Sequence, residues 1–171
     1  VCQEKCTCNQ ESTSSVDLTQ PILATYTNND GTFVAVVNDD NVLRFVKLSE
    51  VTDFTKSMFY LEADGEYYNI KLYNGLYLTW ENASDGNETA AKTRNHSDNQ
   101  KWMLIETADN TYKLRNLGHK NAWGDYCYGV VGELLKFGDF GAWVFENKDI
   151  PYVERDDSTT DTEESKNFSA W

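Results

Sequence analysis

A pattern that recurs about every 40 residues limits the fold of this chain more than any other feature. An aromatic residue that opens a hydrophobic segment recurs at intervals of 43 and 41 residues, at Phe59, Trp102 and Trp143. A glycine recurs at intervals of 44 and 43 residues, at Gly31, Gly75 and Gly118. The copies are in circular order, because the third begins at Gly141 and its second half stands near the start of the chain, at residues 22–37. Two markers with one period predict a supersecondary unit that is repeated three times.

Each repeat has the pattern of β-strands. Apolar and polar residues alternate in "YYNIKLY" and "YKLRN", with Asn-Asp-Gly and Asn-Gly turns nearby. The segment "DNQKWMLIETADNTYKLRN" predicts a hairpin with strands at residues 101–106 and 111–115, and "VVNDDNVLRFVKLSEV" favours a hairpin over a helix because it is rich in Val and Phe. Three units of four strands predict an all-β chain: a six-stranded barrel closed by hairpins, which is the β-trefoil, with the repeated aromatic residues in its core.

The repeat resembles the ricin-type (R-type) lectin β-trefoils. That family carries Gln-x-Trp in each repeat, then a strand, a turn and a Gly-containing element, and here Gln100-Lys101-Trp102 with "GHKNAW" from Gly118 matches it. Gly141-Ala142-Trp143 keeps only the Trp, and Ser57-Met58-Phe59 keeps only an aromatic residue. The pattern is also similar to the fibroblast growth factor and fascin-type trefoils. The resemblance implies a trefoil fold and, from the lectins, carbohydrate recognition.

The resemblance also implies where a sugar would bind. R-type sites use an Asp after the Gly element, an aromatic residue in the next hairpin, and an Asn or Gln near the Gln-x-Trp. Thr79 in "GLYLTW" and Ala122-Trp123 in "GHKNAW" stand where the Asp is expected. A flat aromatic ring can pack on the CH groups of a sugar while polar groups bind its hydroxyls. A carboxylate and aromatic residues gather after "GHKNA", so we predict a ligand-binding cluster of Trp123, Asp125, Tyr126 and Tyr128. The alternative is that the aromatic residues lie in the core or at the barrel mouth and Asp125 in a turn.

Charge and sequons predict the compartment. The chain has 15 Lys and Arg against 28 Asp and Glu, a formal charge of −13, which argues against nucleic acid and anionic membrane as partners. A first residue other than Met fits a processed product, and no apolar run approaches the ~20 residues of a membrane-spanning helix. Four Asn-x-Ser/Thr sequons predict glycosylation of a secreted, extracellular protein, at Asn82, Asn87, Asn95 and Asn167.

Cysteine positions and composition divide the chain. We predict a disulfide-pinned, cysteine-rich arm at residues 1–20, a β-trefoil domain at 21–153 and an acidic, flexible tail at 154–171. The four cysteines predict disulfides that tie an N-terminal cysteine to the body, at Cys2, Cys6, Cys8 and Cys127. Zinc binding by "CQEKCTC" and an inter-chain disulfide from the arm are the alternatives.

Catalytic motifs are missing from the sequence. Only two histidines occur, His96 and His119, and neither lies in a nucleophile motif; there is no phosphate-binding loop or calcium loop. We therefore expect a non-enzyme with no cofactor and no metal, whose partners are glycans. The predicted function is a secreted glycoprotein with a trefoil carbohydrate-recognition module. The first alternative is a structural or assembly glycoprotein that self-associates through the N-terminal arm, and the second is a protease inhibitor or cytokine-like ligand.

Overall fold

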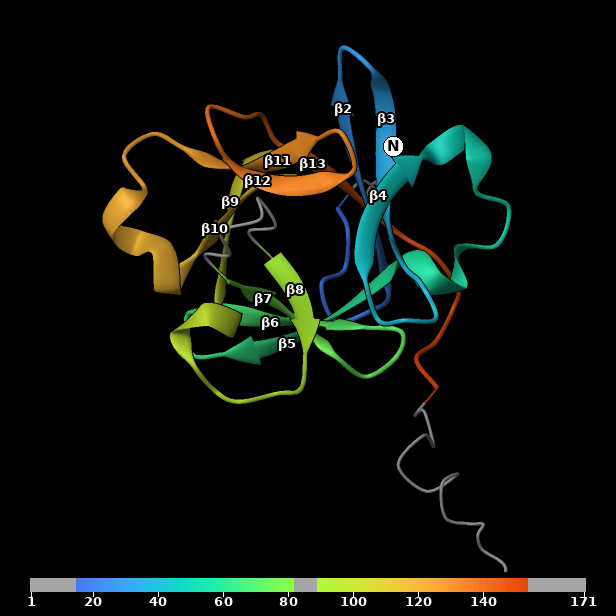
Figure 1. Cartoon of the computed structure of the whole chain (residues 1–171), viewed down its shortest axis with the longest axis horizontal. Helices are drawn as coiled ribbons and strands as arrows, with labels where there is room; N and C mark the ends of the chain where they lie inside the picture. Colours follow the sequence, from blue (N-terminus) through green and yellow to red (C-terminus); the bar gives the residue numbers. More distant parts are fainter. Residues whose placement is uncertain (1–14, 82–88, 154–171) are drawn as a thin grey trace, which may run out of the picture.

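The computed structural model of the chain describes residues 15–81 and 89–153. These residues form strands connected by short turns and 3-10 helices (Figure 1). The strands are β2 (Ile22–Asn28), β3 (Gly31–Val37), β4 (Leu43–Lys47), β5 (Met58–Asp64), β6 (Tyr67–Leu72), β7 (Tyr77–Trp80), β8 (Thr89–Lys92), β9 (Trp102–Ala108), β10 (Thr111–Asn116), β11 (Cys127–Val131), β12 (Leu134–Gly138) and β13 (Trp143–Asn147). The 3-10 helices are η1 (Leu48–Glu50), η2 (Phe54–Ser57), η3 (Asp98–Gln100) and η4 (Leu117–Ala122).

Six of the strands close into a barrel. β2 pairs with β5, β5 with β6, β6 with β9, β9 with β10, β10 with β13, and β13 with β2, all antiparallel. The other strands form the hairpins β3–β4, β7–β8 and β11–β12, which lie around the middle of the view in Figure 1. A six-stranded barrel with three such hairpins is the β-trefoil, so the predicted fold is confirmed. The circular order of the repeats is explained because β13, from the end of the domain, pairs with β2 at its start.

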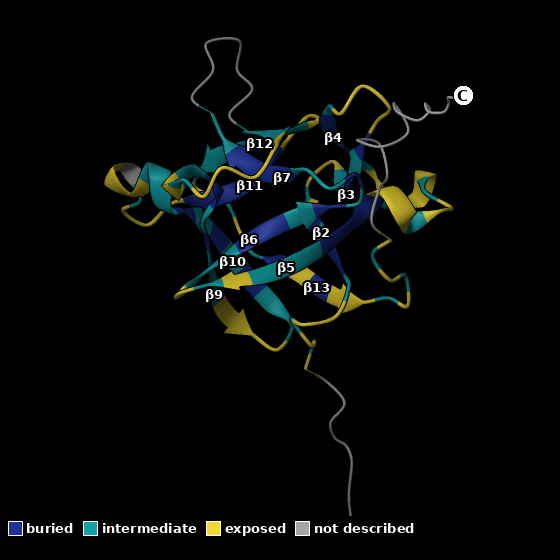
Figure 2. Cartoon of the chain, turned by 90° about the horizontal axis from the view of Figure 1, so that it is seen from below, coloured by how far each residue is buried: buried dark blue, intermediate teal, exposed yellow. Residues whose placement is uncertain are grey.

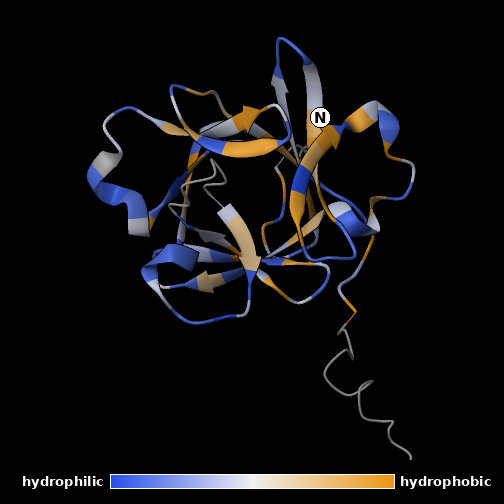
Figure 3. Ribbon diagram, in the orientation of Figure 1, coloured by the Kyte–Doolittle hydropathy of each residue, from blue (hydrophilic) through white to orange (hydrophobic). Residues whose placement is uncertain are grey.

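The repeated aromatic residues fill the core, as predicted. Phe59, Trp102 and Trp143 are 2%, 0% and 1% exposed. The indole N–H of Trp102 donates to the carbonyl oxygen of Leu78 at 3.0 Å, and that of Trp143 donates to the carbonyl oxygen of Tyr128 at 2.9 Å. Buried residues lie in the strands at the middle of Figure 2, while Figure 3 shows the turns and 3-10 helices to be largely hydrophilic.

The predicted hairpins are confirmed in position. β9 and β10 pair with Leu104 opposite Leu114, with one register shift between Thr111 and Tyr112, and they begin or end within two residues of the predicted bounds. β3 and β4 form the hairpin predicted for residues 36–51, around a turn in which the N–H of Asn41 donates to the carbonyl oxygen of Asn38 at 2.9 Å. Local alternation and turn residues were therefore sufficient to predict these elements.

The Gly-containing elements of the second and third hairpins are not equivalent, contrary to the sequence prediction. "GLYLTW" forms a turn and strand β7, whereas "GHKNAW" forms η4, and the third hairpin begins only at Cys127. The counterpart of Leu78 is Tyr128, because each offers its carbonyl oxygen to the core indole of the following repeat. Trp123 therefore does not correspond to Trp80, although the two end similar sequence segments.

Cys127 is fully buried and its thiol is free in this structure. Its predicted partners in the arm lie outside the described residues, so the disulfide between Cys127 and the arm stays a prediction. The Sγ–H of Cys127 donates to the carbonyl oxygen of Phe140 at 2.9 Å, and burial raises the pKa of the thiol. Among the described residues, no helix has the length and apolar character needed to cross a membrane. The predictions for the other cysteines, most of the arm, the tail and three of the sequons lie outside the described residues, at Cys2, Cys6, Cys8, Asn82, Asn87 and Asn167.

Candidate ligand-binding site

Three of the four residues predicted to bind a ligand share the loop between η4 and β11. Asp125 is exposed, Tyr126 is 48% exposed, and Trp123 is half-buried. Arg115 holds this loop, because its Nε donates to the carbonyl oxygen of Tyr126 at 2.9 Å and its Nη2 donates to that of Gly124 at 2.8 Å. The same guanidinium lies 5.3 Å from the ring centre of Trp123, so a cation already occupies the vicinity of that ring.

Tyr128 does not belong to this surface cluster. Its side chain is 0% exposed, and its hydroxyl lies 3.0 Å from Nδ1 of His119. The ring packs edge-on against Trp102, with ring centres 5.2 Å apart. A sugar cannot stack on a ring enclosed in this way, so this part of the site prediction is corrected: Tyr128 is a core residue.

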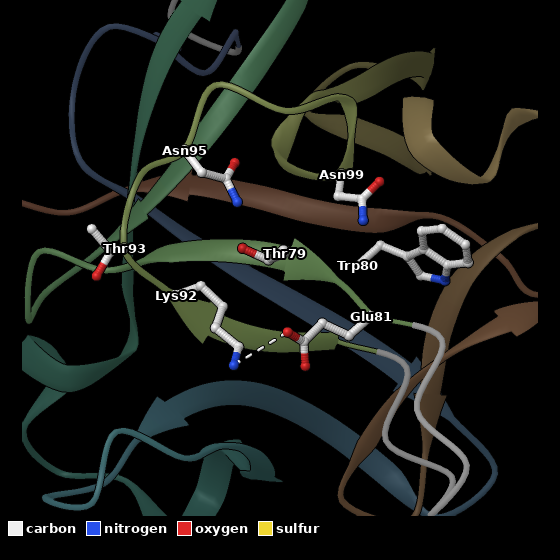
Figure 4. Close-up of a pocket in the computed structure, with 7 residues that line it drawn as sticks. All are labelled: Thr79, Trp80, Glu81, Lys92, Thr93, Asn95 and Asn99. Carbon is white, nitrogen blue, oxygen red and sulfur yellow. Dashed lines mark ion pairs between the residues drawn. The ribbon is translucent and has the colours of Figure 1, made fainter.

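A hollow of about 540 Å³ lies instead beside the β7–β8 hairpin (Figure 4). β7, the residue after it and the paired end of β8 form one side, and the segment from Thr93 into η3 forms the other. Its volume is within the range of roughly 300–1,000 Å³ that is typical of ligand pockets. The hollow is lined by Thr79, Trp80, Glu81, Lys92, Thr93, Asn95 and Asn99.

Gln100, the first residue of the Gln-x-Trp motif, holds the two sides of the hollow together. Its side chain is 1% exposed, and its Nε2 donates to Oγ1 of Thr79 at 3.0 Å and to the carbonyl oxygen of Thr93 at 2.9 Å. Its Oε1 accepts the N–H of Asn95 at 2.9 Å. Thr79 is 4% exposed and donates its own hydroxyl to the carbonyl oxygen of Tyr77. The hydroxyl at the position expected for Asp is therefore engaged within the protein.

Other polar groups remain around the opening of the hollow. The carboxylate of Glu81 and the ammonium of Lys92 form an ion pair at 3.2 Å across the β7–β8 hairpin. Opposite them, Asn95 and Asn99 extend their side chains from the segment before β9 toward β7 (Figure 4). The hollow thus combines hydrogen-bond donors with a carboxylate acceptor, which is the combination that sugar hydroxyls require.

Trp80 supplies an aromatic ring on the same side as Glu81. The indole is half-buried, and it stacks on His119 with ring centres 4.5 Å apart and an interplanar angle of 14°. From His119 the row of rings continues to Phe137 at 4.6 Å and from there to Tyr126 at 5.9 Å. The hollow and the predicted loop cluster are therefore the two ends of one row of aromatic side chains.

The sequence prediction missed Trp80, Glu81 and Asn99. Trp80 directly follows Thr79 in "GLYLTW", and Asn99 directly precedes the Gln-x-Trp motif. The resemblance asked for an aromatic residue and an Asn or Gln near that motif, so this signal was present. The loss of the Asp at position 79 directed the prediction to the next repeat instead.

Comparison with known proteins agrees with the fold and with the motif. Residues 55–126 match the family model of the ricin-type β-trefoil lectin domain-like proteins. Over 78 residues the chain is 30% identical to pierisin of Pieris brassicae; the match covers 42% of this chain and 9% of that protein, so the chain spans less than a tenth of this curated relative.

Two solved structures have the same fold. The designed threefold-symmetric protein ThreeFoil superposes with a TM-score of 0.55 at 16% identity, covering 74% of this chain and 99% of that one. The lectin of Polyporus squamosus, solved with the epitope Neu5Aca2-6Galb1-4GlcNAc, superposes with a TM-score of 0.56 at 10% identity, covering 78% of this chain and 50% of that one. The structure is that of a β-trefoil, and its residues 55–126 are similar to the ricin-type β-trefoil lectin domain-like proteins.

Proposed function

We propose that this trefoil is the carbohydrate-recognition module of a secreted glycoprotein, and that it binds sugar in the hollow beside Trp80. The observation that carries the proposal is the placement of a half-buried indole, a carboxylate and two amides around one opening. The likeness to a lectin whose structure contains a sialylated glycan supports the ligand class. The formal charge of −13 argues against a polyanionic glycan, because a strongly acidic chain repels polyanions.

The construction of the hollow supports a preformed site. Gln100 fixes Thr79 on β7 and the backbone of Thr93 and Asn95 on the opposite side, so both walls are held before a ligand arrives. Residues that are already in place lose little conformational entropy on binding. The aromatic ring is likewise held, because His119 stacks on Trp80.

The experiment is a glycan array with the unglycosylated chain, followed by calorimetric titration of the best ligand with two variants. Trp80→Ala and Asn99→Ala are each expected to weaken binding at least tenfold, about 1.4 kcal/mol, while Tyr126→Ala changes it little. Thermal unfolding of each variant shows whether it is folded. Tyr126→Ala is the matched control, because it removes an aromatic ring at the other end of the row.

Two results would overturn the proposal. The first is that the folded, unglycosylated chain binds no glycan at millimolar concentration. The second is that Tyr126→Ala abolishes binding while Trp80→Ala does not, which would assign the site to the loop before β11.

A further inference from the structure

One side chain that lines the hollow is also a predicted glycosylation site. Asn95 opens the sequon Asn95-His96-Ser97, and its side chain is exposed. Its Oδ1 accepts the N–H of Ser97 at 2.9 Å, and this hydrogen bond distinguishes the oxygen of the side-chain amide from its nitrogen. The Nδ2 is consequently the atom turned toward Thr79 on the far wall of the hollow, as Figure 4 shows.

An N-glycan is attached through this nitrogen atom. When the amide nitrogen attacks the anomeric carbon of an oligosaccharide activated as a lipid diphosphate, the C–N bond forms, the anomeric C–O bond breaks, the lipid diphosphate leaves and Nδ2 loses one proton. The first sugar would then begin at the opening of the hollow, between the wall with Trp80 and Glu81 and the wall with Asn99. The hollow has enough volume, about 540 Å³, to hold it.

We propose that a glycan on Asn95 occupies the hollow, so that modification of Asn95 and binding of a separate sugar exclude each other. The second half of this statement rests on the proposed function. A tethered sugar has an effective concentration of roughly millimolar or more, since its linker is a single side chain. It therefore competes well with a free glycan of ordinary affinity, and glycosylation would set whether the module is open to outside ligands.

The sequon offers a matched pair of variants for the test. Oγ of Ser97 is buried and has no hydrogen-bond partner among the described residues, so Ser97→Ala removes the sequon without breaking a hydrogen bond. Ser97→Thr keeps the sequon. All three proteins are produced in a host that attaches N-glycans, and peptide mass spectrometry measures the fraction of Asn95 that carries one.

The expected result is that Ser97→Ala binds the array ligand at least tenfold more tightly than the glycosylated wild type, and that Ser97→Thr binds like the wild type. Equal binding by Ser97→Ala and by a wild type whose Asn95 is fully glycosylated would overturn the proposal. So would a wild type in which Asn95 stays unmodified although other sequons carry glycans.

A second measurement separates this inference from the proposed function. If Ser97→Ala binds no glycan, the proposed function fails. Whether the Asn95 glycan occupies the hollow is then tested by the rate at which an endoglycosidase releases that glycan from the folded protein. We expect release at least tenfold slower than from the unfolded chain, with most of this protection lost in Trp80→Ala. Release at equal rates from folded and unfolded protein would show that the glycan lies outside the hollow.

Discussion

Gln100 connects the stability of the trefoil to the shape of its hollow, and replacing it should affect both. Gln100→Leu keeps a side chain of similar size and removes three hydrogen bonds, those to Thr79, Thr93 and Asn95. Each bond contributes about 0.5–1.5 kcal/mol net, and a buried group left unpaired costs about 1–3 kcal/mol. The carbonyl oxygen of Thr93 and the N–H of Asn95 are only partly buried and regain some water, so we expect a total cost of about 2–4 kcal/mol.

The assay is chemical denaturation of wild type and variant, with sugar titration of the folded variant. We expect the denaturant concentration at the unfolding midpoint to fall, while the slope of the unfolding free energy against denaturant stays unchanged. Sugar affinity should fall as well, because the wall that carries Asn95 is released from β7. Asn99→Ala is the comparison, since Asn99 lines the hollow and, within residues 15–81 and 89–153, only its backbone oxygen is seen to accept a hydrogen bond, from Asn116. A cost below 1 kcal/mol for Gln100→Leu, with sugar affinity intact, would refute the assigned role of Gln100.

Gln100→Glu should make the stability of the folded chain depend on pH. A neutral carboxylic acid at this position can donate one hydrogen bond, but the ionised form would be a buried carboxylate facing the carbonyl oxygen of Thr93. Its folded-state pKa should therefore lie above the value of about 4.3 in the unfolded chain. The stability that depends on the neutral acid is fully present below pH ~4.3 and is lost as the pH rises through the folded-state pKa. Relative to the wild type, the variant should therefore become less stable with rising pH across that interval.

Two further predictions concern the core. Trp102→Phe and Trp143→Phe each remove an indole N–H bond to a buried carbonyl oxygen and leave a smaller ring, so each should lower the free energy of unfolding by about 2–4 kcal/mol in denaturant titrations; a loss below 1 kcal/mol would contradict the packing. Cys127 should resist alkylation in the folded protein and react only on unfolding, because burial keeps the thiol inaccessible and raises its pKa; rapid labelling of Cys127 in native protein, followed by peptide mapping, would contradict its burial.

The trefoil could be predicted from the sequence because its core imposes the repeat. Phe59, Trp102 and Trp143 occupy equivalent positions in the barrel, where each must fill similar space, so an aromatic residue recurs at each of them. The connection between β10 and β11 is not constrained in this way. It contains η4 and the loop after it, and its Gly118 resembled Gly75 by spacing alone.

The site was predicted less well, because the positions of its residues are not constrained by the repeated core either. The predicted cluster shares one loop, but the sequence does not reveal that Tyr128 points into the core while Tyr126 remains exposed two residues earlier. The hollow joins Trp80 on β7 to Asn99 in η3, and this proximity depends on how Gln100 bridges the two segments. A side-chain bridge between segments that are distant in sequence leaves no signal in the local periodicity of apolar residues.

The Gln-x-Trp motif has two separate tasks in this chain. Trp102 points into the barrel and secures the preceding hairpin through the carbonyl oxygen of Leu78, while Gln100, two residues earlier, secures the wall of the hollow. The other two copies carry Ser57 and Gly141 at the position of Gln100. Trp143 keeps the first task, through the carbonyl oxygen of Tyr128, whereas Phe59 has no ring N–H and only fills the core. A serine is too short to bridge two segments, and Oγ of Ser57 is buried with no hydrogen-bond partner in the described part of the chain. Loss of the glutamine therefore leaves the fold intact and removes the support for a preformed hollow, which is why we place the ligand in the one repeat where the motif is complete.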